Sequence, residues 1–181
     1  VEAHAGRKRH VITTRVEHPA VLSTCRYLGN NGCRVTELPV DHEGMLDLKL
    51  LEDCIVDDTA IVSVMWANNE TGVVFPIEEI AEICRRKDVT LHTDAVQAVG
   101  KLPIDLSKTP VDLLSLSGHK LHAPKGVGVL YIRKGTRLAP FMLGGHQEGG
   151  KRAGTENVPY IVGLGKAAEL AGVGLRRRIF A

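Results

Sequence analysis

The segment PIEEIAEICRRKDVTLHTDA, residues 76–95, combines two hydrophobic patterns. Its first part predicts an amphipathic helix over 76–88, because four apolar residues recur at the spacing of one helical face. These four are Ile77, Ile80, Ile83 and Cys84. Its second part, VTLHTDA, is typical of a short strand. A helix that leads directly into a strand predicts an α/β fold.

The same alternation extends outward in both directions. We predict further strands at 10–14, 33–40, 59–67, 111–117 and 126–133, and further helices at 19–32, at 46–55 and from about 158 to 171. Strands and helices in this order indicate a mostly parallel sheet with helices on both faces.

Composition narrows the class of protein. The chain has 181 residues, of which 44% are hydrophobic and 24% charged, as in an ordinary globular domain. Its net charge of +2 is too small to favour nucleic acid or an anionic membrane surface. No apolar run approaches the ~20 residues of a membrane span, and no signal peptide is recognisable. Four cysteines without a C-x-x-C pair indicate small buried side chains in a reducing cytoplasm.

Polar clusters follow four of the predicted strands. They are VEHPA at 16–20, ANNETG at 67–72, HTDAVQ at 92–97 and SGHK at 117–120. In parallel sheets, ligand groups gather beyond the carboxyl ends of the strands. We therefore expect one shared site that contains side chains from all four clusters.

Lys120 is the residue of this set whose structural and functional interpretations differ most. A lysine in a turn is usually an exposed charge without a special role. A lysine activated by partial desolvation can instead bind a carbonyl compound covalently. Its neighbours Ser117 and His119 could donate to a phosphate, although a Ser-x-His pair alone is weak evidence.

The other candidates also have structural alternatives. Asp94 could cap a helix or pair with a protonated ring nitrogen, and Gln97 could reach the same ring. His18 alone is more often structural than catalytic. Asn69 is most simply a turn residue, because Asn-Glu-Thr-Gly is turn chemistry.

Two other motifs are weaker. GHQEGGK, residues 145–151, matches the first part of a phosphate-binding P-loop, but Arg152 stands where Ser or Thr should bind Mg²⁺. His119 and His122 with Asp94 could suggest a metal, but the spacing fits no zinc motif. We expect neither site.

Five motifs together resemble the cysteine desulfurases of the nitrogen-fixation type, in the class V aminotransferase superfamily of pyridoxal-phosphate enzymes. They are VEHPAV, VSVMWANNETGVVFPI, HTDAVQAVGK, SGHKLHAPKGVGVLY and GGHQEGGKRAGTEN, and the likeness extends from about Arg9 to Leu170. The resemblance implies the large domain of the fold-type I pyridoxal-phosphate enzymes. It also implies removal of sulfur from L-cysteine in a homodimer, with an iron–sulfur scaffold protein as sulfur acceptor.

The resemblance further implies residue roles. Lys120 matches the lysine that holds the cofactor and later moves protons, and His18 matches the histidine that stacks on its ring with an acid–base role. Asp94 matches the partner of the pyridine nitrogen. The remaining matches are Gln97 and Asn69 near the phenolic oxygen, Ser117 and His119 at the phosphate, and Thr155 at the phosphate of the neighbouring subunit's cofactor.

Some parts of the family pattern are not found. An upstream phosphate loop, a substrate-binding arginine and a nucleophilic cysteine on a downstream loop are missing. We therefore assign residues 1–171 to part of the cofactor domain and 172–181 to an atypical or truncated tail. A selenocysteine lyase or another class V enzyme, and a non-catalytic fragment, remain alternatives.

Overall fold

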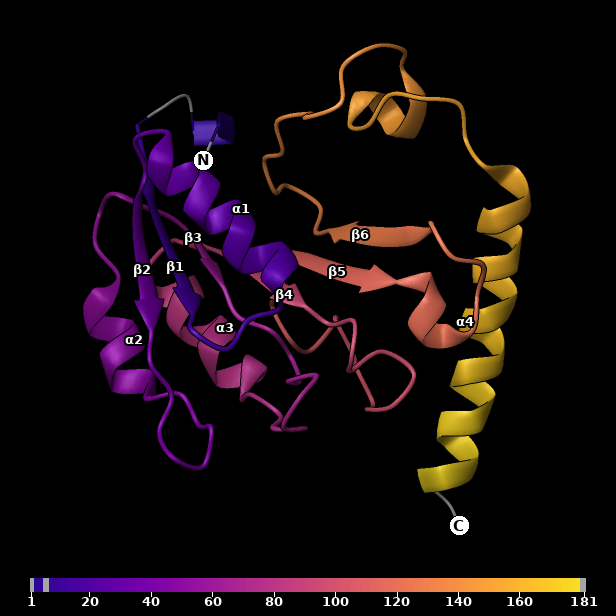
Figure 1. Cartoon of the computed structure of the whole chain (residues 1–181), viewed down its shortest axis with the longest axis horizontal. Helices are drawn as coiled ribbons and strands as arrows, with labels where there is room; N and C mark the ends of the chain where they lie inside the picture. The colour runs from indigo at the N-terminus through magenta and orange to yellow at the C-terminus, as the bar shows by residue number, and fades with distance from the viewer. Residues whose placement is uncertain (1, 5–6, 180–181) are drawn as a thin grey trace.

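A computed structural model of the chain describes residues 2–4 and 7–179. Six strands form one sheet, and three α-helices belong to the same α/β unit, with a fourth at its edge (Figure 1). The strands are β1 His10–Thr14, β2 Arg34–Leu38, β3 Thr59–Ser63, β4 Thr90–Asp94, β5 Leu113–Ser117 and β6 Gly128–Ile132. The helices are α1 Pro19–Asn30, α2 Leu48–Cys54, α3 Ile77–Arg86 and α4 Val158–Ile179, with 3-10 turns η1 Glu2–His4, η2 Gly118–Leu121 and η3 Gln147–Gly150.

The sheet has the order β2-β1-β3-β4-β5-β6. Neighbouring strands are parallel from β2 to β5, and β6 returns antiparallel to β5. The predicted α/β fold with a mostly parallel sheet is therefore confirmed. Because β2 through β5 are parallel, their carboxyl ends lie at one edge.

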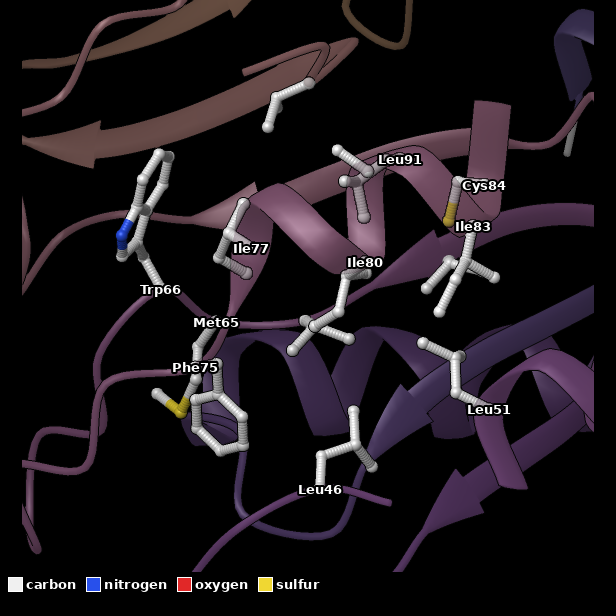
Figure 2. Close-up of a cluster of buried hydrophobic side chains, with 14 of the residues drawn as sticks. Leu46, Leu51, Met65, Trp66, Phe75, Ile77, Ile80, Ile83, Cys84 and Leu91 are labelled. Atoms are coloured by element: carbon white, nitrogen blue, oxygen red, sulfur yellow. The ribbon is translucent and has the colours of Figure 1, made fainter. Parts of the chain in front are cut away.

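The two faces of the sheet carry different side chains. Ile12, Val62 and Leu91 occupy one register row and are buried in the main core with residues of α2 and α3. Figure 2 shows this core, where side chains of α3 meet those of α2 and of the segments that follow β3. The other face has polar residues in the adjacent row, and α1 crosses it (Figure 1).

The predicted amphipathic helix is confirmed as α3. Its apolar face is fully buried, with Ile77, Ile80, Ile83 and Cys84 all in the core, while its acidic first turn and basic last turn complement the helix dipole. Burial of this face anchors α3 and thereby fixes β4, which follows after a short turn and ends at Asp94.

Most predicted bounds differ from the structure by one or two residues, and two differ by more. β3 ends at Ser63 and the chain continues buried to Ala67, so the predicted strand over 59–67 is shorter. The last helix continues past the predicted end near residue 171 to Ile179. Gly172 and Gly174 lie inside it, and a glycine costs only about 1 kcal/mol in a helix interior.

Helix α4 also corrects the expectation that no apolar run approaches membrane-spanning length. Within the described part of the chain it alone qualifies by length and composition, over the 18 residues Val158–Leu175. One such helix is weak evidence for a membrane span. Only 11% of the window is buried, and its buried residues Leu164 and Ala167 pack against Leu121 and Ala123 at η2.

Candidate functional site at the carboxyl edge of the sheet

The structure brings the exits of four parallel strands together. His18 follows β1, Asn69 follows β3, Asp94 ends β4, and β5 leads into Lys120 in η2. Backbone hydrogen bonds join three of these exits in sequence. The N–H of Trp66 donates to the carbonyl of Asp94 at 2.8 Å, and the N–H of Ala95 donates to the carbonyl of Ser115 at 2.9 Å. The predicted shared edge is therefore present.

His18 is the N-cap of α1. Its Nδ1 accepts a hydrogen bond from the N–H of Ala20 at 3.2 Å, and Pro19 starts the helix without needing an N–H partner. An accepting Nδ1 places the proton of the neutral ring on Nε2. The hydrogen bond at Nδ1 therefore holds the exposed imidazole in place, and Nε2 is available to a ligand.

Asp94 and Gln97 lie on the turn after β4, and both are half-buried. Asp94 Oδ1 accepts the N–H of Val96 at 2.9 Å within a turn, so the structural alternative of a helix cap is not formed, because no helix begins here in the described part of the chain. One oxygen of this carboxylate is thus used in the turn, and the other is available. Gln97 Oε1 accepts from Lys101 Nζ, so this amide is directed along its own turn.

The segment with Lys120 is built tightly. Ser117 Oγ and His119 Nδ1 are 2.7 Å apart, so these two polar groups form a pair beside Lys120. Gly118 between them admits no side chain, because a Cβ there would lie 2.9 Å from the carbonyl oxygen of Val127. His122 ends η2 in the left-handed conformation, with φ of 63°. The side chain of Lys120 is exposed, so the described residues do not supply the desolvation that we expected.

Asn69 is presented by a turn that its neighbour Asn68 holds. Asn68 is buried, its Oδ1 accepts the N–H groups of Glu70 and Thr71, each at 2.9 Å, and its Nδ2 donates to the carbonyl of Val16 at 2.9 Å. The predicted turn is confirmed. Asn69 itself is exposed and donates to Glu70 Oε1 at 2.9 Å.

Sequence reasoning missed Glu17. This carboxylic acid is buried at the exit of β1, where Oε1 accepts from the N–H of Met65 at 2.7 Å and from the hydroxyl of Thr14 at 3.0 Å. Burial raises the pKa of Glu17 to about 7. The signal in the sequence was an acidic residue directly before His18 and three residues after a strand of buried residues.

Thr155 is not brought beside the other predicted residues. It is exposed in the loop between η3 and α4. Figure 1 shows this orange loop beyond β6, on the side away from β5. Its expected role across a subunit boundary stays a prediction.

The weaker motifs form no site in the described structure. GHQEGGK forms the exposed turn η3, with Glu148 and Gly149 at positive φ, and lacks the strand and helix that flank a P-loop. Among the described residues, no group of three or more His, Cys, Asp or Glu side chains could hold a metal ion.

A parallel sheet whose carboxyl edge offers a lysine, a carboxylate and two imidazoles defines an α/β protein with a polar ligand site. The family model for class-V aminotransferases matches residues 1–177, and the chain belongs to this family. The cysteine desulfurase NifS of Azotobacter vinelandii is 62% identical over 164 residues, which cover 91% of this chain and 41% of that protein.

Solved structures agree with this assignment. A NifS-like protein superimposes with a TM-score of 0.93 at 47% identity, over 97% of this chain and 49% of the other. SspA in complex with cysteine has a TM-score of 0.87 at 43% identity, over 90% of this chain and 47% of the other. The chain thus spans less than half the length of these relatives.

Proposed function

We propose that the protein containing this chain is a pyridoxal-phosphate-dependent cysteine desulfurase. In this proposal it removes sulfur from L-cysteine, releases L-alanine and keeps the sulfur as an enzyme persulfide. The observation that carries the proposal is the 62% identity with a cysteine desulfurase across 91% of the chain. The likeness to SspA in complex with cysteine favours cysteine over selenocysteine as the substrate.

The carboxyl edge of the sheet fits pyridoxal phosphate by the chemistry of its donors. Ser117 and His119 form a hydrogen-bonding pair next to Lys120, which suits a phosphate that places a carbonyl carbon at this lysine. Asp94 keeps one carboxylate oxygen for a ring nitrogen, and His18 keeps a ring face and Nε2. When bound, the cofactor supplies an electron sink for negative charge at the substrate Cα.

The chain's own residues would then have these tasks. Lys120 would hold the carbonyl carbon of the cofactor and, as a free amine, would take the proton from the substrate Cα. Asp94 holds a proton on the ring nitrogen by its negative charge. His18 stacks on the ring and offers Nε2 for proton transfer. Gln97 and Asn69 contact the phenolic oxygen, and Gln97 must turn away from Lys101 to do so.

The remaining features of the proposal concern the assembly. The protein acts as a cytoplasmic homodimer, in which Thr155 reaches the phosphate in the partner's site. The exposed loop that carries Thr155 supports this, since nothing in its own site requires it there. A cysteine thiolate outside residues 1–181 would attack the substrate sulfur and form a persulfide. The Cβ–S bond breaks, and its electron pair stays on the substrate carbon, which takes up a proton to become the methyl group of L-alanine. An iron–sulfur scaffold protein would then accept the outer sulfur of the persulfide.

Borohydride reduction of the full-length protein with pyridoxal phosphate tests the lysine assignment. We expect the reduced cofactor on the peptide that contains Lys120, and label on Lys101 or Lys125 would contradict the assignment. With L-cysteine and a reductant, the protein should form alanine and sulfide in equal amounts. Lys120→Ala should lower this rate by at least roughly 10²-fold. Lys125→Ala, an exposed lysine in the same loop, serves as the matched control and should keep it.

A further inference from the structure

Glu17 is a buried acid that the proposed chemistry does not use. Its side chain is only 4% exposed. Both hydrogen bonds of the carboxyl group go to Oε1, from the N–H of Met65 and the hydroxyl of Thr14. Oε2 is buried and has no hydrogen-bond partner in the part of the chain that the structure describes. A buried carboxyl group in this setting needs an explanation, because an unpaired polar atom is costly.

The contacts of Glu17 join two strand exits. Its bond to Met65 ties the turn after β1 to the exit of β3, and a second tie runs from Asn68 Nδ2 to the carbonyl of Val16. The next residue after Met65, Trp66, donates to the carbonyl of Asp94 at 2.8 Å. His18 directly follows Glu17. The position of His18 relative to Asp94 therefore depends on this carboxyl group.

The surroundings of Glu17 favour its neutral form. Burial is the largest cause that raises its pKa to about 7, and the charge of Asp94 on β4 acts in the same direction. Burial is the largest cause that raises the pKa of the Cys25 thiol on α1, and the charge of Glu17 acts in the same direction. Asp94 is the charged group that acts on the pKa of Glu17. Two hydrogen bonds to Oε1 leave Oε2 as the atom that carries the proton.

We propose that Glu17 is a positioning residue that acts as a neutral carboxylic acid. It locks the turn that carries His18 to the exit of β3, and its neutrality leaves Asp94 as the negative charge beside the ring nitrogen. The statement about Asp94 rests on the proposed function. The neutral tie, by which we mean the hydrogen bonds from Met65 and Thr14 to the protonated carboxyl group of Glu17, rests on the contacts of the chain alone.

The neutral tie has a signature in pH. A carboxyl group whose pKa rises on folding stabilises the fold fully below its unfolded pKa, here 4.5, and this stabilisation is lost as the pH rises to about 7. Glu17→Gln keeps an oxygen that can accept both hydrogen bonds and cannot ionise, so this variant should not lose stability in that window. Glu17→Ala removes the acceptor and leaves the N–H of Met65 unpaired.

The first arm of the test uses the full-length protein freed of cofactor. Urea unfolding is measured from pH 4.5 to 8 for wild type, Glu17→Gln and Glu17→Ala, with Glu37→Gln on neighbouring β2 as the charge-matched control. The ratio of the unfolding constants of wild type and Glu17→Gln should rise by roughly 10²-fold across this range, and Glu37→Gln should not reproduce the change. The same ratio at every pH, or a ¹³C-monitored Glu17 pKa near 4.5, would overturn the proposal.

The second arm uses the cofactor-loaded protein and follows its visible absorbance during dissociation. Glu17→Gln should retain the cofactor as wild type does at pH 6. Glu17→Ala should lose it at least about tenfold faster, and if that variant does not fold, Thr14→Val tests the same tie by removing one donor. Glu17→Gln that behaves like Glu17→Ala would show that the charge is required and would refute the neutral role. Wild type that binds no cofactor would reject the proposed function, and the first arm would still decide the neutral tie.

Discussion

His92 shows how one side chain can join three strands. Its Nδ1 is 2.8 Å from Ser63 Oγ on β3, and its Nε2 is 2.8 Å from Ser115 Oγ on β5. Burial lowers the pKa of His92 below 6.5. Because His92 lies two residues before Asp94 on β4, this cross-link fixes the strand end that carries the carboxylate.

We predict that His92→Leu lowers the free energy of unfolding by roughly 1–3 kcal/mol at pH 8, because the buried Ser63 hydroxyl loses its partner. The sign of the pH effect follows from the lowered pKa. Above pH 6.5 the imidazole ring is neutral in the folded and the unfolded state. Below pH 6.5 the unfolded chain takes up a proton that the folded chain resists, so the free energy of unfolding decreases as the pH is lowered. Urea unfolding at pH 8 and 5.5 should show a smaller acid loss for His92→Leu than for wild type. Exposed His42→Leu is the control, and an equal acid loss in both variants would contradict the prediction.

Elements were predictable where hydrophobic periodicity is strong. The apolar face of α3 predicted both the helix and its burial. The strand β4 could be predicted as well, because the short apolar segment after the helix ends in a polar cluster. The antiparallel return of β6 was also latent in the sequence, since ten residues between Ser117 and Gly128 are too few for a parallel crossover. The length of α4 was not predictable from local signals, because its glycines suggest a stop that the rest of the helix overrides.

The predictable part of the site is its location rather than its side-chain contacts. Strand exits could be read from polar clusters, so His18, Asp94 and Lys120 fall at one edge as expected. The orientation of Gln97 toward Lys101 depends on side-chain rotamers, and the exposure of Lys120 depends on which segments cover it. Sequence patterns encode neither property. Glu17 was missed because its role depends on a contact with Met65, a residue distant in the sequence.

Helix α4 supports η2, and two of its glycines allow a matched prediction. A Cβ at Gly163 would lie 3.0 Å from Pro124 Cδ, whereas a Cβ at Gly165 would meet no atom within 4 Å. Gly165→Ala should therefore raise the free energy of unfolding by about 0.5–1 kcal/mol through helix propensity alone. Gly163→Ala should raise the free energy of unfolding by less, because Pro124 and the adjoining η2 must move to make room for the new methyl group. Urea unfolding of the two variants compares them directly, and a larger gain for Gly163→Ala would show that η2 does not rest on this face.

At the scale of the whole molecule, large apolar side chains remain exposed on several elements, and the two most exposed lie in one loop. Phe141 is 88% exposed and Leu143 81% exposed, in the loop before η3, and several apolar residues of α4 are also exposed. Large exposed apolar side chains such as these are often covered at an interface. The relatives are more than twice as long as the matched segment. In the proposed homodimer, the rest of the protein and a second copy are the segments that could cover these side chains.

The four cysteines of the chain lie away from the carboxyl edge or inside the scaffold. Cys25 of α1 and Cys84 of α3 are buried, and burial raises the pKa of Cys25 and raises that of Cys84 to about 12. Cys33 precedes β2 at the amino edge of the sheet, and Cys54 ends α2. Attack on the substrate sulfur needs a thiolate on a segment that can reach the site, and thiolates are disfavoured in apolar surroundings.

We therefore predict that the isolated polypeptide of residues 1–181 has no cysteine desulfurase activity. Its site is open, since Lys120, His18 and His119 are all exposed, so bound cofactor would not be protected from water. The polypeptide is purified and incubated with pyridoxal phosphate, L-cysteine and a reductant, and sulfide and alanine are assayed together. The full-length protein in the same buffer is the positive control, and free cofactor gives the background rate. Equal amounts of sulfide and alanine from residues 1–181, well above that background, would show that one of the four cysteines can reach the substrate after all.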